Sequence, residues 1–165
     1  MIDANTLITT WDISYPPSVF STLWEQLSIR YDQLVLLKPI FDEIDPADAG
    51  VHQLSPSEYA IRYPLRYWVE RSGLIIETVT DEINIESLKL ERKYEISNIS
   101  KGASQIDITL IAYAKITGLT VTTLEAQQPQ RPGSSSKYKI PLICQDEGVS
   151  CINFVELLQR LHICI

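Results

Sequence analysis

The chain has 165 residues, of which 45% are hydrophobic and 21% charged. These proportions are typical of a globular protein and the length is that of one domain, so disordered and fibrous classes are excluded. Lys and Arg number 14 and Asp and Glu number 21, which gives a net charge of −7 and excludes a protein that coats nucleic acid through a generally basic surface. A nuclease is not excluded, because an acidic active site itself contributes negative charge.

Two further features of the sequence bear on location. No apolar run reaches the roughly 18 residues that a membrane-spanning helix needs, and the N-terminus lacks the basic and apolar segments of a signal peptide. The three cysteines are too few for a disulfide framework and fit a reducing compartment. We therefore expect a cytoplasmic protein without a membrane partner.

The first half of the chain predicts short strands and helices from the spacing of apolar residues and the positions of proline. A strand is expected at residues 1–8 and a helix at residues 18–30. A second strand is expected at residues 34–37, followed by a helix from Pro39 to a stop at Pro46. The segment Ser55-Pro56-Ser57-Glu58 then has the pattern of a capping box, with proline at the first helical position. Pro64 is expected to kink this helix or to start another, and Gly73 to end the helical region.

The second half begins with a helix expected from Thr80 to Tyr94, whose acidic first turn suits the positive end of the helix dipole. A helix at residues 106–117 and a strand at 119–124 follow. A short helix is expected at 141–147, a small strand at 149–152, and a last helix after a cap formed by Asn153 and Glu156. A loop rich in Gln, Pro, Gly and Ser lies at residues 127–136. The alternation of strands and helices predicts an α/β fold with a mainly parallel central sheet flanked by helices.

Four acidic residues lie where such a sheet binds its ligands, beyond the carboxyl ends of the strands. They are Asp3 in the first expected strand, Glu43 after the second, Asp107 at the start of the helix 106–117, and Glu125 after the strand 119–124. The last three are singly explained as helix or loop acids, but a carboxylate among apolar strand residues, as at Asp3, needs a partner. Together the four predict a site for Mg²⁺ or Mn²⁺, because converging carboxylates need cations and these ions prefer oxygen ligands. Such a site can hydrolyse phosphodiesters without a protein nucleophile.

Several motifs occur in order along the chain: IDANTLI at 2–8, DEI at 42–44, DITLIAYA at 107–114, TVTTLE at 120–125, and KIPLICQDEGVSCINFVELL at 139–158. This ordered set resembles the PIN-domain nucleases, the fold of VapC-type toxin ribonucleases, and looks closest to a prokaryotic PIN-like subgroup. The resemblance covers essentially the whole chain. It implies a single PIN-like domain over residues 1–165, folded as a three-layer sandwich with helices on both sides of the sheet.

The resemblance also implies a function, that of a metal-dependent endoribonuclease acting as the toxin of a toxin–antitoxin system. The implied catalytic residues and metal ligands, for Mg²⁺ or Mn²⁺, are Asp3, Glu43, Asp107 and Glu125, with Asn5 and Thr123 in support. RNA is the implied substrate, and an antitoxin protein and a second copy of the chain are the implied partners. Glu125 departs from the aspartate that is usual at the fourth position. The alternative is a PIN-like domain that binds RNA or protein without cleaving.

The segment RYPLRYWVER interleaves Arg62, Arg66 and Arg71 with tyrosine and tryptophan side chains. Because arginine pairs with phosphates and aromatic rings stack on bases, these arginines are candidate RNA contacts. The plainer interpretation, which we favour, is a helix with an aromatic core face and a solvated basic face. Further candidates for phosphate contact are Lys89, Arg92, Lys93, Lys137 and Lys139.

Overall fold

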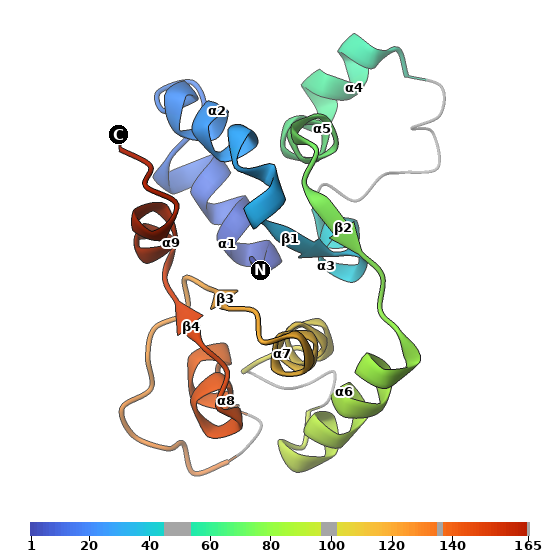
Figure 1. Cartoon of the computed structure of the whole chain (residues 1–165), viewed down its shortest axis with the longest axis vertical. Helices are drawn as coiled ribbons and strands as arrows, with labels where there is room; N and C mark the ends of the chain where they lie inside the picture. The colour runs from blue at the N-terminus through green and yellow to red at the C-terminus, as the bar shows by residue number, and fades with distance from the viewer. Residues whose placement is uncertain (45–53, 97–101, 135–136, 165) are drawn as a thin grey trace.

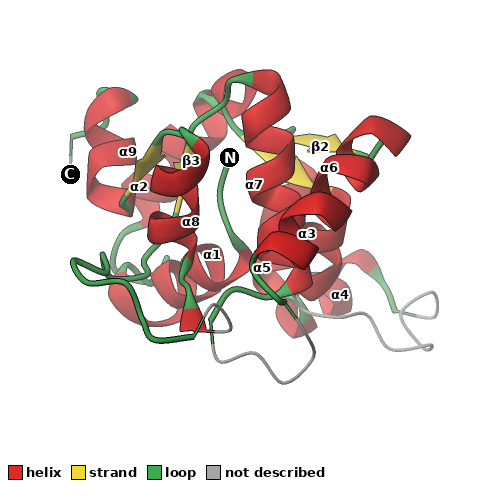
Figure 2. Cartoon of the chain, turned by 90° about the horizontal axis from the view of Figure 1, so that it is seen from below, coloured by secondary structure: helices red, strands yellow, loops and turns green. Residues whose placement is uncertain are grey.

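The computed structural model describes residues 1–44, 54–96, 102–134 and 137–164. Most of the described chain is helical, and the strands are short (Figure 2). Figure 1 shows α1 to α5 with β1 and β2 on one side of the N-terminal residues, and α6 to α8 with β3 and β4 on the other. The expected α/β class is confirmed at this level, as helices combined with small parallel sheets. The helix stop expected at Pro46 lies outside the described residues.

Most elements of the first half agree with the apolar periodicity, and the two that differ are described below. They are α1 (Ala4–Thr9), the π-helical turn η1 (Thr10–Ser14), α2 (Ser21–Ile29), the 3-10 turn η2 (Tyr31–Gln33), β1 (Val35–Leu37), α3 (Lys38–Glu43), α4 (Pro56–Arg62), α5 (Pro64–Ser72) and β2 (Ile75–Glu77). The capping box is confirmed, since Ser55 Oγ accepts from the backbone N–H of Glu58 and the Glu58 carboxylate accepts from that of Ser55. Pro64 starts a new helix, and Gly73 ends it in the left-handed conformation, φ 77°.

The second half also matches its predicted elements. They are α6 (Asp81–Lys93), α7 (Gln105–Thr117), β3 (Val121–Thr122), α8 (Ile140–Glu147), β4 (Cys151–Ile152) and α9 (Phe154–Arg160). Asn153 and Glu156 form the predicted cap of the last helix. The two expected strands here are shorter than predicted, because only two residues of each make a regular parallel ladder.

All strand pairing among the described residues is parallel. Strand β1 pairs with β2, and β3 pairs with β4. A single parallel bridge between Ile2 and Thr122 adds the N-terminal segment beside β3. The first carboxylate and the end of β3 are therefore brought to the same place.

One expected strand is absent from the described structure, and one observed strand was not expected. The strand predicted over residues 1–8 is reduced to the bridge at Ile2, because the Asp3 side chain accepts from the backbone N–H of Thr6 and starts α1 instead. Asp3 is thus a helix cap and not a strand residue. Strand β2 was not expected, since a strand of three residues is too short to show a period.

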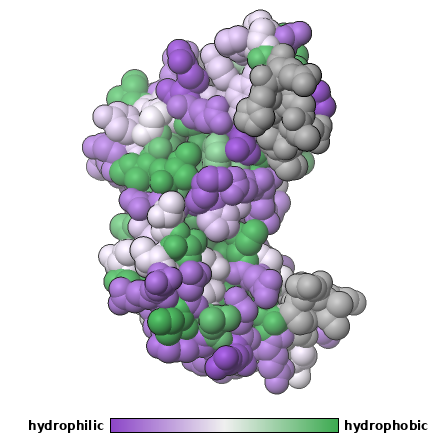
Figure 3. Space-filling view, turned by 90° about the vertical axis from the view of Figure 1, so that its right-hand side faces the viewer, coloured by the Kyte–Doolittle hydropathy of each residue, from purple (hydrophilic) through white to green (hydrophobic). Residues whose placement is uncertain are grey.

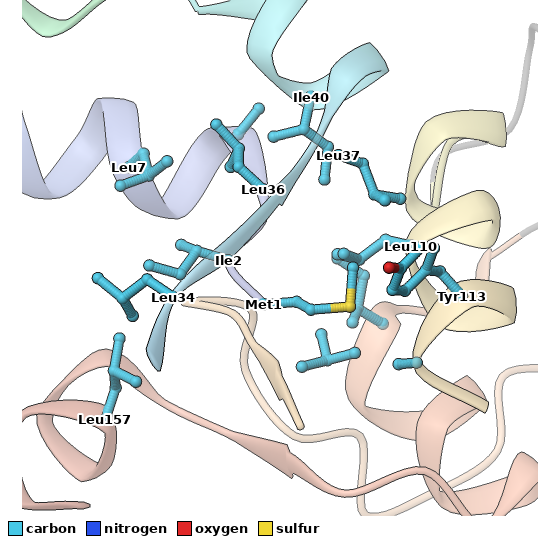
Figure 4. Packing of buried hydrophobic residues seen from close by; sticks show 14 of the residues in the cluster. Met1, Ile2, Leu7, Leu34, Leu36, Leu37, Ile40, Leu110, Tyr113 and Leu157 are labelled. Carbon is cyan, nitrogen blue, oxygen red and sulfur yellow. The ribbon is translucent and has the colours of Figure 1, made fainter. Parts of the chain in front are cut away.

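The core is built around the N-terminal residues. Figure 4 shows the side chains of Met1 and Ile2 between those of β1 and α7, and both residues are buried. A second part of the core is aromatic, with ring centroids 4.7 Å apart for Trp11 and Trp24 and 5.0 Å apart for Trp24 and Trp68. The indoles join η1, α2 and α5 into one packed unit.

The surface carries scattered apolar side chains among polar ones, and one face of this kind is seen in Figure 3. Among the described large hydrophobic residues, the most exposed are Ile61, Ile13, Val19 and Ile29. They belong to different elements, and scattered exposure of this kind is normal. Within the described ranges, no helix is both long enough and apolar enough to cross a membrane.

A buried carboxylate fastens α6, α7 and α8 together. The side chain of Glu147 is 5% exposed and accepts from Lys93 Nζ at 2.6 Å and Lys115 Nζ at 2.8 Å. The hydroxyl of Tyr94 donates to the same carboxylate at 2.7 Å. Burial alone would raise the pKa of Glu147, but these hydrogen bonds outweigh it and hold the pKa at about 2.

The substitution Glu147→Gln tests this fastening. A carboxyl whose pKa is held below its unfolded value stabilises the fold above that value, and the contribution is lost as the pH falls toward the folded pKa. We expect the variant to lose about 1–3 kcal/mol in the free energy of unfolding at neutral pH. Its melting temperature should also fall less than that of the wild type between about pH 5 and pH 2. Thermal melts across this range, with the exposed α2 residue changed in Glu25→Gln as a control, would contradict the account if Glu147→Gln matched the control.

Candidate acidic site

Asp3 is held at the start of α1 by one threonine. Its Oδ1 accepts from the backbone N–H of Thr6 at 2.6 Å, and its Oδ2 accepts from the Thr6 hydroxyl at 2.9 Å. The same hydroxyl accepts from the backbone N–H of Leu124 at 2.8 Å. Asp3 is 2% exposed, so the hydrogen bonds supply the partners that a buried carboxylate needs. Thr6 was not among the expected residues, although its place three residues after a capping aspartate is a sequence signal for this contact.

Glu125 lies just beyond β3 and reaches the start of α8. Its Oε2 accepts from the backbone N–H of Ile140 at 2.7 Å. Its own backbone N–H donates to the hydroxyl of Thr123 at 3.1 Å, and Thr123 is buried beside Asp3, whose carboxylate it hydrogen-bonds. The expected supporting residue Thr123 therefore contacts both the first and the fourth acid.

Asp107 belongs to the capping box of α7. Its Oδ2 accepts from the backbone N–H of Ser104 at 2.7 Å, and its own backbone N–H donates to Ser104 Oγ at 3.2 Å. The start of α7 is positioned by Gly102, where a Cβ atom would lie 2.1 Å from the carbonyl oxygen of Tyr138. Only glycine permits this close approach of the two backbones. The helix-terminus explanation of Asp107 is thus correct, and it leaves Oδ1 without a hydrogen bond among the described residues.

Glu43 and Asn5 are the exposed members of the expected set. Glu43 is the last residue of α3, and its carboxylate makes no hydrogen bond or ion pair with another described residue. Asn5 accepts from the hydroxyl of Thr9, one turn along its own helix, at 3.1 Å. Glu43 is therefore free to move its carboxylate, and Asn5 has a local contact that explains it without a ligand.

The charges of Asp107 and Asp3 act on the other acids of the expected set. Burial is the largest cause that raises the pKa of Asp3, Glu43 and Glu125, and the charge of Asp107 raises all three further. The charge of Asp3 also raises the pKa of Glu43 and Glu125. Because charge interactions weaken with distance and are screened by water, these effects mean that the four carboxyl groups share one region. The bridge between Ile2 and Thr122 places Asp3 near the end of β3, and the charge effects relate Asp107 and Glu43 to the same acids.

The donor chemistry of this region suits Mg²⁺ or Mn²⁺, which take oxygen ligands. The oxygens without a hydrogen-bond donor among the described residues are Asp107 Oδ1, Glu125 Oε1 and both of Glu43. In the described part of the chain, however, no three His, Cys, Asp or Glu side chains stand close enough to hold one metal ion. The carboxylates therefore interact through their charges, but no three of them are close enough to bind one metal ion in this structure.

The arginine-rich segment has structural contacts. The Arg66 guanidinium lies 4.1 Å from the Phe41 ring centroid and donates to the carbonyl oxygens of Phe41 and Ile44 at 3.4 and 3.3 Å. Its side chain is 13% exposed, which agrees with the plainer interpretation of this helix. Arg66 thereby ties α5 to the end of α3, next to Glu43. Arg62 and Arg71 are exposed on α4 and α5.

Lys139 is the basic candidate near the acids. Its charge lowers the pKa of Glu125, after burial and the Asp107 charge have raised it. Its backbone N–H donates to Gln128 Oε1 at 2.8 Å, which holds the residue at the start of α8. Its ammonium group forms no hydrogen bond or ion pair with other residues that the structure describes. A cation beside the acids could contact a phosphate bound there.

The substitution Glu43→Gln tests the repulsion. A carboxyl whose pKa is raised on folding destabilises the fold once the pH rises above its unfolded pKa. Removing the charge of Glu43 should therefore stabilise the folded protein at neutral pH. We expect metal-free Glu43→Gln protein to melt higher than wild type at pH 7 and to lose this advantage below about pH 4. Thermal melts with chelator, alongside Glu25→Gln, measure this. An unchanged or lower melting temperature at pH 7 would argue against charge repulsion between Glu43 and the other acids.

Comparison with known proteins places the chain in a family. The family model described as Domain of unknown function (DUF4411) matches residues 1–165. Searches of the curated proteins and of the solved structures give no match. Because the family model covers every residue, the chain belongs to the DUF4411 family.

Proposed function

We propose that the protein is a metal-dependent endoribonuclease with a PIN-like three-layer sandwich fold. The observation that carries the proposal is that the charge of Asp107 raises the pKa of Asp3, Glu43 and Glu125, which come from three other segments of the chain. Clustered carboxylates are costly unless a cation neutralises them, and they persist chiefly where that cost has a use. The parallel pairing of the N-terminal segment, β3 and β4 supports the same proposal, since ligands of such sheets bind beyond the strand ends.

Each acid would have a distinct part in holding Mg²⁺ or Mn²⁺. Asp107 Oδ1 and Glu125 Oε1 have no donor among the described residues, and their other oxygens are fixed by backbone N–H groups. Glu43, exposed at the end of α3, can turn its carboxylate toward them. Asp3 is held by Thr6 and contributes charge from a buried position. When bound, the metal would supply the charge that neutralises the phosphate and activates water for hydrolysis.

Other residues would act on the RNA. Lys139 offers an ammonium group beside Glu125, where it can pair with a phosphate oxygen of the backbone. In an acidic protein this local cation matters, because the net charge of −7 repels RNA at a distance. Thr123 keeps Glu125 and Asp3 in register through its hydroxyl.

The biological setting in the proposal is that of a cytoplasmic toxin with an antitoxin protein as partner, and with a second copy of the chain as a further partner. The alternative is a PIN-like domain that binds RNA or protein without cleaving. One observation favours the alternative, namely that no three metal-ligating side chains in the described residues converge on one point. The two functions differ in a single measurable property, which is turnover.

The variant Asp107→Asn separates them. Asparagine keeps an acceptor for the Ser104 N–H and so keeps the capping box, while it removes the charge that acts on the other three acids. We expect cleavage of single-stranded RNA in Mg²⁺ or Mn²⁺ to fall at least about 100-fold, with folding and RNA affinity nearly unchanged. The matched control is Asp81→Asn, which changes an exposed aspartate in the first turn of α6. Lys139→Ala should weaken RNA binding and its salt dependence.

The outcomes are distinct. Cleavage that survives chelator, or an Asp107→Asn protein as active as the control, would contradict a metal-dependent site. RNA binding without cleavage in either metal would favour the non-cleaving alternative. Circular dichroism of both variants verifies that a loss of turnover is not a loss of fold.

A further inference from the structure

A pocket of about 410 Å³ opens directly beside the acidic site. It lies between the segment after β3, the start of α8 and the turn from β4 into α9, and Thr123 and Glu125 form the wall that it shares with the acids. Its volume is within the range of sites that hold small ligands. A molecule bound at the acids would therefore extend into this pocket.

Two side-chain amides line the pocket and have hydrogen-bonding capacity to spare. Asn153 Oδ1 accepts from the backbone N–H of Glu156 at 2.9 Å, but its NH₂ group has no partner among the described residues. The carboxamide of Gln127 makes no hydrogen bond with any described residue. A carboxamide presents donors and an acceptor side by side, which is the pattern that pairs with the edge of a nucleobase.

The other walls define the charge and shape of the ligand. Leu124, Pro141 and Ile152 supply apolar surface, and Leu124 is 38% exposed beside the acids. The charged side chains in the lining are the carboxylates of Glu125 and Glu156, and no Lys or Arg of the described chain lines it. A phosphate is disfavoured here by repulsion, whereas a neutral ring with hydrogen-bonding edges fits.

We propose that this pocket holds the base of the nucleotide adjoining the phosphate at the acidic site, and so gives the protein a base preference at the cleaved position. The inference rests on the proposed function, because it takes the phosphate to lie at the four acids. Lys139 stands near Glu125 but outside the pocket lining, so the phosphate is assigned to the place beside a cation and the base to the pocket that has none among the described residues.

Binding of a base can be tested without cleavage. The four nucleosides are titrated separately into ¹⁵N-labelled wild-type protein, and the side-chain NH₂ signals of Gln127 and Asn153 are followed by NMR. At least one nucleoside should shift both signals, and it should shift the NH₂ signal of Gln159, on the exposed face of α9, much less. Equal or absent shifts for all four nucleosides would overturn the proposal that this pocket binds a base. Mn²⁺ alone broadening these signals, with no nucleoside effect, would assign the pocket to a cation instead and would also overturn it.

Base preference is tested with variants that keep the fold. Asn153→Asp retains the acceptor that caps α9, and Gln127→Glu is nearly isosteric, so each exchanges an amide for a carboxylate with little change in shape. Gln159→Glu is the matched control, with the same charge change on α9, the helix that Asn153 caps, but outside the pocket lining. Cleavage of short RNAs that differ at one base should show a wild-type preference of roughly tenfold or more, altered by both pocket variants and not by the control.

The two tests distinguish a failure of the pocket proposal from a failure of the proposed function. Nucleoside binding with no cleavage of any RNA would sustain the pocket and count against the ribonuclease. Cleavage with no base preference, unchanged in Asn153→Asp and Gln127→Glu, would sustain the ribonuclease and overturn the pocket.

Discussion

Repulsion among four carboxylates constrains the whole site, because each must be held in place against the charges of the others. The protein does this with hydrogen bonds that also build its secondary structure. Asp3 starts α1, Asp107 starts α7, and Glu125 accepts from the first N–H of α8. Acids placed at helix N-termini gain from the positive end of the dipole, which offsets part of the repulsion. Glu43 lacks such a contact among the described residues and is the exposed member of the group.

The framework around the acids is anchored away from them. Strand pairing at Ile2 brings the N-terminal segment to β3, and Arg66 ties the end of α3 to α5. Near the far end of α7, Lys115 meets the buried carboxylate of Glu147, which also pairs with Lys93 of α6. Helix α7 is thus fastened at both ends, by a capping box at its start and by ion pairs near its end.

Much of this arrangement could be predicted from the sequence, because its signals are local. The capping boxes at Ser55 and Asn153 and the helix end at Gly73 need only neighbouring residues, and all were found where expected. The strand expected at Asp3 was wrong because the same local chemistry favours a helix cap over an extended backbone. The role of Arg66 depends on carbonyl groups of another helix, more than 20 residues away in sequence, which no periodicity reveals. The four acids could be expected to gather, but their distances depend on the packing of four segments.

The central claim is that the four acids form one electrostatic unit with Asp107 at its centre. It is tested most directly by following the side-chain carboxyl carbons of Asp3, Glu43 and Glu125 by ¹³C NMR as a function of pH, in wild type and in Asp107→Asn. The account predicts that the pKa of all three groups falls when the Asp107 charge is removed, since that charge raises each of them. Three pKa values that stay the same in the variant would contradict it.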